Sequence, residues 1–422
     1  MNFLRCVTSG GHRKQADLNR HSTGTKEIAM ATDQQLLLES HRQQFPALAN
    51  KLYFNYGGQG PLPQPALEAI QSAYGQMQEL GPFTGGALAW MTEKVEETRG
   101  AIASQLNVSP STITLTESVS SGCNIAMWGF DWQPGDHLLL SDCEHPGIIA
   151  TAQQLSHRYG IEVSTFPLMA TLNEGDPIAV MVEHLRPNTR LAVVSHILWN
   201  TGQVLPLAAM AQACRQTVPT LAILVDAAQS VGVLPLSVDE LDVDFYAFTG
   251  HKWFCGPDGL GGLYVRPASL ASLEPTFIGW RGINMDIQGK PTGWKPDGRR
   301  YEVATSAFPL FPGLTAAIEL QQQWGTSSDR YQRILHLSRI LWEMLNTIPK
   351  IKCLRTTAPE SGLVAFQIDG ISNHRSFVQQ LESQSVMVRL IADPNCVRAC
   401  MHYLTLESEV DQLVQAIDKA VE

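Results

Sequence analysis

The sequence lacks several features that would place the chain in a specialised class of protein. No run approaches the roughly 20 apolar residues that a helix needs to span a bilayer, so we expect no membrane association. Charged residues make up only 17% of the 422 residues, and the formal net charge is −10, without a dense Lys/Arg stripe. This balance argues against a nucleic-acid partner, because phosphate backbones are bound by clustered positive charge.

The sequence also lacks a cysteine framework. The eight cysteines are scattered along the chain, without the spacing of a disulfide framework or a zinc site. Cys396 and Cys400 come closest to a metal-binding pair, but no second pair and no histidine cluster joins them. We therefore predict no metal site, and a cytoplasmic location in which free thiols stay reduced.

The length suits a large domain followed by a smaller one. Residues 1–32 are polar and partly basic and contain no apolar signal-peptide core, which excludes a secretory signal and predicts a disordered N-terminal extension. We expect residues 33–64 to pack on the small domain as an N-terminal segment. Residues 65–312 are then the large domain, and residues 313–422 the small α+β domain.

Helix-like and strand-like segments alternate through the large domain. Its expected strands are apolar almost throughout, as they are when helices cover both faces of a sheet, and lie at about 112–116, 137–141, 162–166, 190–196, 221–225, 244–247 and 261–265. The clearest expected helices cover 65–80, 92–106, 120–130 and 147–159. In the small domain we expect helices at 314–324, 329–348, 376–383 and from 408, and strands at 363–368, 386–390 and 400–405. The alternation predicts an α/β fold with a mostly parallel, doubly wound sheet, whose ligand lies at the carboxyl ends of the strands.

Lys252 is the strongest chemical signal in the sequence. It lies between two expected strands, with Thr249, Gly250 and His251 before it and the glycine-rich stretch 256–259 after it. Such neighbours are a poor setting for a solvated surface charge. A lysine that forms a Schiff base must be partly desolvated, so that its amine is neutral and nucleophilic.

Asp226 ends an apolar strand upstream of this lysine. Pyridoxal phosphate (PLP) needs a carboxylate beside its pyridine nitrogen, because the protonated ring then accepts electrons from a substrate carbanion. Gln229, one helical turn later, is placed to donate to the ring oxygen. An aspartate at a strand end can also simply cap the next helix, and Asp226 alone does not distinguish these roles.

Two further strand ends carry suitable polar groups. The stretch Thr116–Gly122 joins a strand to a helix, where backbone N–H groups and hydroxyls form a phosphate site, although serines there often act only as helix caps. His145 follows another strand, where its ring can stack on the pyridine face or belong to an ordinary surface loop.

Taken together, these motifs resemble the class V aminotransferase superfamily, over about residues 50–420. The chain is most similar to the cysteine desulfurase and selenocysteine lyase branch, and within it to cystine C–S lyases. The resemblance implies a PLP enzyme of fold type I, with residues 65–312 binding the cofactor, and a homodimer whose active sites lie at the subunit interface.

The resemblance also implies a role for each motif residue. It assigns the covalent PLP link to Lys252, the pyridine-nitrogen contact to Asp226 and the ring-hydroxyl contact to Gln229. It assigns ring stacking to His145 and phosphate contacts to Thr249 and His251. Val119 and Ser120 stand where the family usually has two threonines, so one phosphate hydroxyl is lost and a backbone contact must replace it.

Near the C-terminus, Arg398 matches the family arginine that grips the substrate α-carboxylate, and Arg389 matches a second arginine nearby. A guanidinium fork suits a carboxylate better than an ammonium group does. In desulfurases a longer loop between these arginines bears the attacking cysteine, and here that loop is shortened. Cys396 precedes Arg398 directly, at a position that aligns with a non-nucleophilic residue.

Two other positions are candidates for contact with the substrate. The family asparagine position carries Trp199, with Asn200 one step later, and either can lie near the cofactor. Trp280, in an irregular stretch at 279–298, is a candidate aromatic wall of the substrate site contributed by a partner subunit, or an interface packing residue.

The sequence thus predicts PLP-dependent β-elimination of L-cystine to pyruvate, ammonia and cysteine persulfide. The persulfide is expected to supply sulfur for iron–sulfur clusters, with an iron–sulfur apoprotein or another sulfur acceptor as recipient. The alternatives are a cysteine desulfurase using Cys396, a class V aminotransferase or epimerase on another amino acid, and a non-catalytic amino-acid-binding protein with this fold.

Overall fold

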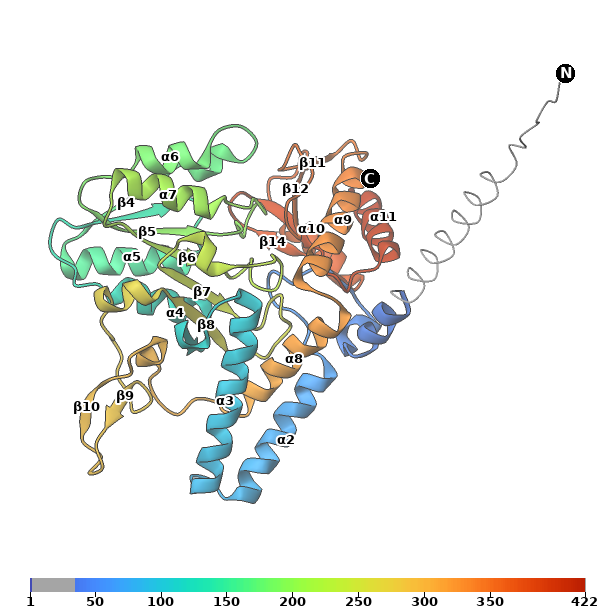
Figure 1. Ribbon diagram of the computed structural model, residues 1–422. Helices are drawn as coiled ribbons and strands as arrows, with labels where there is room; N and C mark the ends of the chain where they lie inside the picture. The colour runs from blue at the N-terminus through green and yellow to red at the C-terminus, as the bar shows by residue number, and fades with distance from the viewer. Residues whose placement is uncertain (2–34, 422) are drawn as a thin grey trace.

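The structure is a computed structural model that describes Met1 and residues 35–421. Apart from Met1, the expected disordered extension at 1–32 lies outside the described residues. Figure 1 shows a large domain built on one sheet, beside a smaller domain that holds the C-terminus. Residues of the candidate active site come from both domains.

The large domain is built on a seven-stranded sheet in the order β2-β8-β7-β6-β5-β3-β4. Only β8 runs antiparallel to its neighbours, and the other pairs are parallel, which confirms the predicted α/β fold with a mostly parallel sheet. The strands are β2 (Ile113–Thr116), β3 (His137–Ser141), β4 (Glu162–Phe166), β5 (Thr189–Ser195), β6 (Ala222–Asp226), β7 (Phe245–Thr249) and β8 (Gly261–Val265).

Helices cover both faces of this sheet (Figure 1). Leu139 and Ile223 point into a core with α3, α6, α7 and α8, whereas their neighbours Leu138 and Leu224 point into a core with α4 and α5. Alternate residues of one strand are therefore both buried, which explains the continuous apolar runs. The helices are α2 (Gln64–Leu80), α3 (Gly85–Leu106), α4 (Val119–Trp128), α5 (Pro146–Tyr159), α6 (Pro177–Glu183), α7 (Leu207–Thr217) and α8 (Leu310–Trp324).

Helix α3 begins seven residues earlier than the pattern predicted, at Gly85 rather than Thr92. The Thr84 hydroxyl accepts a hydrogen bond from the Ala87 backbone N–H and so caps the first turn. Two adjacent glycines, Gly85 and Gly86, hide this start in the sequence because glycine is a poor helix former.

The small domain carries an antiparallel sheet in the order β11-β12-β15-β14. Its elements are α9 (Ser327–Leu345), β11 (Ile351–Cys353), β12 (Leu363–Ile368), α10 (Arg375–Ser383), β13 (Val386–Met387), β14 (Arg389–Ile391), β15 (Cys396–Cys400) and α11 (Glu407–Val421). The predicted strand at 400–405 is wrong. The strand ends at Cys400, and the chain then turns, with the Thr405 N–H donating to the His402 carbonyl.

The segment before α2 crosses from one domain to the other. Its strand β1 (Leu52–Tyr53) pairs in parallel with β13 of the small domain, and the Gly60 N–H donates to the His251 carbonyl in the large domain. Helix α8 packs against α2 and α3, and so lies with the large domain. We therefore propose that the small domain begins after Trp324 rather than at residue 313.

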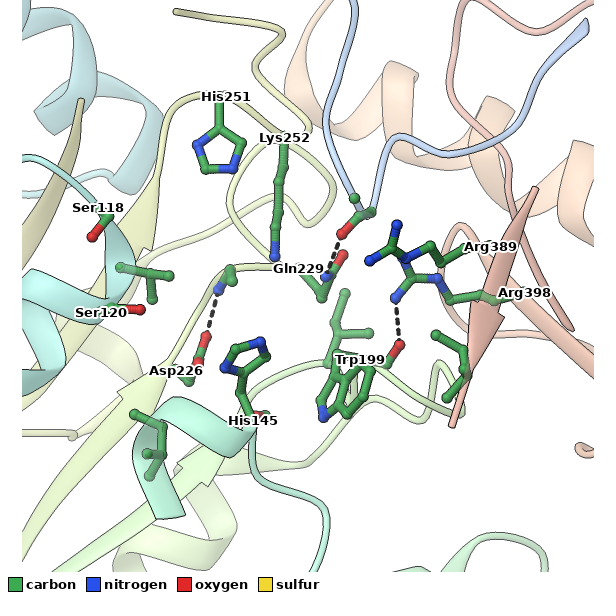
Figure 2. Close-up of a pocket in the computed structure, with 18 residues that line it drawn as sticks. Ser118, Ser120, His145, Trp199, Asp226, Gln229, His251, Lys252, Arg389 and Arg398 are labelled. Carbon is green, nitrogen blue, oxygen red and sulfur yellow. Dashed lines mark hydrogen bonds between the residues drawn. The ribbon is translucent and has the colours of Figure 1, made fainter. Parts of the chain in front are cut away.

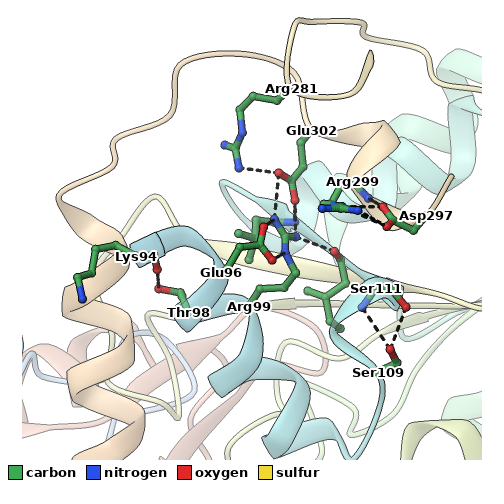
Figure 3. Close-up of polar contacts among 12 residues, drawn as sticks. Lys94, Glu96, Thr98, Arg99, Ser109, Ser111, Arg281, Asp297, Arg299 and Glu302 are labelled. Carbon is green, nitrogen blue, oxygen red and sulfur yellow. Dashed lines mark hydrogen bonds and ion pairs between the residues drawn. The ribbon is translucent and has the colours of Figure 1, made fainter. Parts of the chain in front are cut away.

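The irregular stretch expected at 279–298 contains a short antiparallel hairpin, β9 (Ile283–Met285) and β10 (Pro291–Trp294). Figure 3 shows the ion pairs that tie its base to the large domain. The buried Glu302 carboxylate accepts hydrogen bonds from Arg99 and Arg281, each at 2.5 Å, and from the Leu115 backbone N–H. A buried charge that is paired on both oxygens holds the stretch against the sheet.

In the described part of the chain, no helix combines the length and the hydrophobicity that crossing a bilayer requires. Within the same residues, no cluster of three or more His, Cys, Asp and Glu side chains could hold a metal ion. The cysteines in this range are buried free thiols.

Candidate active site

A cavity of about 300 Å³ lies where the carboxyl ends of the large-sheet strands face the small domain (Figure 2). It is lined from several distant parts of the chain. The predicted residues that line it are Val119, Ser120, His145, Asp226, Gln229, His251, Lys252, Arg389 and Arg398. The fold therefore assembles most of the predicted site in one place.

Lys252 enters this cavity from the loop between the antiparallel neighbours β7 and β8. Burial lowers the pKa of its amine to about 8, the charge of Asp226 opposes this shift, and the nearby charge of Arg398 adds to it. A larger fraction of the amine is therefore neutral near neutral pH than in a solvated lysine. Such an amine can attack a carbonyl and can accept a proton.

Asp226 is the last residue of β6 and is buried beneath the cavity. Its Oδ1 accepts a hydrogen bond from the Ala228 N–H at 2.9 Å, and its Oδ2 has no hydrogen-bond donor among the described residues. The site therefore offers an anionic oxygen to a cationic ring nitrogen. Gln229, on the turn that follows, donates from Nε2 to the Gly57 carbonyl at 2.9 Å.

His145 caps the N-terminus of α5, where its Nδ1 accepts from the Gly147 N–H at 3.2 Å. Burial lowers the pKa of its imidazole, so the ring is neutral and can stack on an aromatic cofactor. The preceding Glu144 is buried and accepts hydrogen bonds from Ser141 and Ser195, which ties the loop after β3 to the end of β5. Burial raises the pKa of Glu144 to about 8.

The far end of the cavity suits an anion. Ser118 caps α4 by accepting from the Ser121 N–H, and Val119 and Ser120 form the first turn, at the positive end of the helix dipole. His251 lines the same cavity, and its Nδ1 is 2.7 Å from the Thr249 hydroxyl. Hydroxyls, backbone N–H groups and an imidazole together form a donor set for a phosphate.

The two arginines come from the small domain and lie opposite each other on the paired strands β14 and β15 (Figure 2). Arg398 is buried, and its Nη1 donates to the Trp199 carbonyl at 2.5 Å. Its Nε is buried without a partner among the described residues. Arg389 is exposed at the edge of the cavity. Because both arginines line the cavity, their guanidinium groups are the donors there that suit a substrate carboxylate.

Comparison with known proteins assigns the family. The model of the class-V aminotransferases matches residues 52–414. The chain belongs to this family. The solved cystine C-S lyase C-DES, in complex with its reaction product cysteine persulfide, is 52% identical, with a TM-score of 0.87 over 89% of this chain and 99% of that one. A C-DES mutant with glycine covalently linked to its PLP cofactor fits equally well.

Curated relatives are more distant in sequence. Isopenicillin N epimerase of Streptomyces clavuligerus is 28% identical over 86% of this chain and 93% of its own length. A probable cysteine desulfurase of Vibrio cholerae is 26% identical over 92% of this chain and 99% of its own length. This class-V aminotransferase family member is therefore a PLP-dependent enzyme, and the donor set described above fits that cofactor.

Cys396 does not have the properties of an attacking cysteine. It lies within β15, where its side chain is buried against Ala365 and Ile391, and burial raises the pKa of its thiol to about 12. The connection from β14 to β15 comprises only residues 392–395. Cys396 is therefore neither ionised nor presented to the cavity.

Three predicted site residues lie outside the lining of this cavity. Asn200 is buried and donates to the Asp393 carbonyl, whereas Trp199 lines the cavity, its indole 5.8 Å from the His145 ring. Thr249 reaches the site through its hydrogen bond to His251. Trp280 is 44% exposed and lines a separate hollow beside Arg99, so a role for it at the substrate site requires a second subunit.

Sequence reasoning missed the contribution of the N-terminal segment. Gly57 and Gly58 line the cavity, and a Cβ at Gly57 would meet Arg398 Nη2 and Gln229 Oε1 at 2.9 Å. Only a glycine lets the backbone approach both groups so closely. The glycine-rich run from Gly57 to Gly60 was the available signal.

Proposed function

We propose that this enzyme cleaves the C–S bond of L-cystine by β-elimination, giving pyruvate, ammonia and cysteine persulfide. The observation that carries the proposal is the short β14–β15 hairpin, which keeps the two arginines but buries the thiol of Cys396. The 52% identity to the cystine C-S lyase C-DES supports the same reaction.

The described residues have a donor or acceptor for each part of the cofactor. Asp226 would hold the pyridine nitrogen, Gln229 the ring hydroxyl and His145 the ring face. The first turn of α4, with His251, would hold the phosphate, and Lys252 would carry the covalent link. PLP, when bound, supplies an electron sink for the carbanion that forms at the substrate α-carbon.

Arg398 would bind and orient the substrate. Its guanidinium lines the cavity and its fork geometry suits the α-carboxylate of an amino acid, and the exposed Arg389 lies opposite it on the paired strand. Binding there would fix the amino acid with its α-carbon toward Lys252. The low-dielectric setting strengthens the pairing, because few waters compete with it.

Lys252 would then move the proton. The Lys252 amine, with its pKa lowered to about 8, would accept the α-proton of the bound substrate. The bond from the β-carbon to sulfur breaks, and its electron pair leaves with the persulfide anion. Hydrolysis of the remaining three-carbon fragment gives pyruvate and ammonia. Because a persulfide is a better leaving group than a sulfide, no cysteine attack is needed.

A direct assay tests this function. Purified enzyme loaded with PLP is incubated with L-cystine and, separately, with L-cysteine, while pyruvate and persulfide are measured. We expect equal amounts of pyruvate and persulfide from cystine, much slower turnover of cysteine, and no product from a Lys252→Ala variant. Absence of pyruvate from cystine would contradict the lyase proposal, and a new amino acid as product would instead support the epimerase or aminotransferase alternative.

We propose a cytoplasmic homodimer in which Trp280 of one subunit approaches the substrate site of the other, since its segment exposes Phe277, Ile278, Met285 and Ile287. An iron–sulfur apoprotein is the proposed sulfur acceptor. Sedimentation of the holoenzyme and a cluster-reconstitution assay with cystine test these two points.

A further inference from the structure

Trp253, which directly follows the cofactor lysine, is completely buried, yet it does not line the active-site cavity. Its indole Nε1 donates a hydrogen bond to Gln229 Oε1 at 2.9 Å. On the other side of the same amide, Gln229 Nε2 donates to the Gly57 carbonyl at 2.9 Å, a contact drawn in Figure 2. The side-chain amide of Gln229 is therefore held at both of its polar atoms.

These two contacts allow only one orientation of the amide. An indole N–H can only donate, so it must meet the amide oxygen, and a backbone carbonyl can only accept, so it must meet the amide nitrogen. A rotation of the amide by 180° would break both hydrogen bonds and set two donors and two acceptors against each other. The NH2 group keeps a second N–H that is not used by Gly57.

Trp253 is itself held from both domains, by Gln321 of helix α8 and by His402 of the small domain. Its carbonyl accepts from Gln321 Nε2 at 2.8 Å and lies 3.2 Å from His402 Nε2. Burial lowers the pKa of His402 to about 3, so the ring is neutral and its Nε2–H is the donor to this carbonyl. The His402 ring stacks on Tyr56 with centroids 4.3 Å apart and lies 6.1 Å from the indole.

We propose that Trp253 is a positioning residue that fixes the Gln229 amide with an N–H, rather than its oxygen, available to the phenolic oxygen of the cofactor. The inference rests on the placement of PLP given above. Buried contacts run from His402 in the small domain through Trp253 to Gln229. These contacts would determine whether Gln229 presents a donor or an acceptor to the cofactor.

This orientation has a measurable consequence for the chromophore on Lys252. An N–H donor stabilises the negatively charged oxygen and so favours the deprotonated form of the chromophore. Without Trp253 Nε1–H the Gln229 amide is held only through the Gly57 carbonyl and can swing about that contact, so the phenolic oxygen loses a well-aligned donor. The midpoint of the visible pH titration should rise by about half to one pH unit, as expected for one hydrogen bond.

The experiment compares Trp253→Phe with a matched control, Trp132→Phe. Trp132 is also a buried tryptophan whose indole donates one hydrogen bond, to the Met127 carbonyl, but it lies in the core on the other face of the sheet from α8. Both holoenzymes are titrated by visible absorbance. The ionisable groups at the cavity are unchanged in both variants, namely His145, Asp226, His251, Lys252, Arg389 and Arg398.

We expect the midpoint to rise in Trp253→Phe alone, while Trp132→Phe keeps the wild-type midpoint with a comparable loss of stability. Gln229→Met should shift the midpoint in the same direction, and adding Trp253→Phe to it should cause no further shift. Equal midpoints in Trp253→Phe and the wild type would overturn the proposal. If Trp253→Phe does not fold, a crystal structure of the wild-type holoenzyme decides, because a Gln229 side chain not bonded to Trp253 Nε1 would also overturn it.

The outcomes separate this inference from the function on which it rests. A wild-type holoenzyme without a visible chromophore, or without pyruvate from cystine, would refute the cofactor or lyase proposal. A normal chromophore and normal lyase activity with an unmoved midpoint in Trp253→Phe would refute only the positioning role.

Discussion

Replacing Cys396 by alanine separates elimination from a mechanism in which a protein cysteine attacks the substrate sulfur. Burial raises the pKa of the Cys396 thiol to about 12. At pH 8 roughly one molecule in ten thousand then carries the thiolate, compared with about a quarter for an unperturbed thiol. The side chain is also inaccessible, packed in the same small cluster as Ala365, Ile391 and Trp199.

The variant should therefore lose stability but not activity. Removing one buried sulfur costs about 1–2 kcal/mol, from the lost burial and the small cavity left behind. For a chain of this size that corresponds to a fall in Tm of a few degrees. The rate of pyruvate formation from L-cystine, measured well below the Tm, should stay within about twofold of the wild type.

The assay follows pyruvate from cystine in the wild type, Cys396→Ala and a second buried-thiol variant, Cys214→Ala, as a control for unfolding. The two variants should behave alike, since Cys214 lies in helix α7, in the large-domain core. A hundredfold loss confined to Cys396→Ala would refute the reasoning and restore the desulfurase mechanism. Treatment of the folded wild type with an alkylating agent should likewise leave cystine cleavage intact.

Lys252, Arg398 and the buried ion pairs of Glu302 can each be tested by one measurement. Incorporation of PLP into the apoenzyme should accelerate as pH rises through about 8, because Lys252 is neutral above that value; a midpoint near that of a free lysine would contradict the burial argument. Arg398→Lys should raise KM for cystine roughly 10- to 100-fold in steady-state kinetics, because one charged hydrogen bond to the substrate carboxylate is lost. An unchanged KM would show that Arg398 does not bind this carboxylate. Glu302→Gln should lower the free energy of unfolding, measured with denaturant, by about 3–5 kcal/mol, because the buried Arg99 keeps its charge but loses its anionic partner. Glu360→Gln, which removes a partly exposed ion pair with Arg355, should lower it by under about 1 kcal/mol.

Much of the large domain could be predicted because its strands are buried on both faces. Continuous apolar runs such as 138–140 and 191–194 end where polar residues begin, so the predicted and observed strands agree closely there. The small domain was harder to predict. The stretch at 400–405 has the apolar pattern of a strand, but after Cys400 it forms a buried turn. Its apolar residues pack against Tyr56 and Trp253. Contacts with such distant residues cannot be predicted from the local sequence pattern.

Site residues such as Lys252 and Asp226 could be predicted, because their residue type and their neighbours in the sequence already indicate a chemical role. The site could not be predicted where the decisive fact is a contact between distant segments. Neither Trp199 nor Asn200 is favoured by residue type, and only the turn after β5 directs the first to the cavity and the second toward Asp393. The glycines at 57 and 58 are held at the site by contacts with distant segments, including the pairing of β1 with β13 and the hydrogen bond from Gly60 to the His251 carbonyl.

The short connection between β14 and β15 also determines how sulfur would leave the enzyme. An enzyme that stores sulfur on its own cysteine must present that residue to a recipient protein, and so needs a flexible arm and a docking partner. Here the four residues 392–395 provide no such arm. The sulfur would depart as a small diffusible molecule, available to any thiol or metal centre in the same compartment, and its delivery would depend on the lifetime of that molecule in solution.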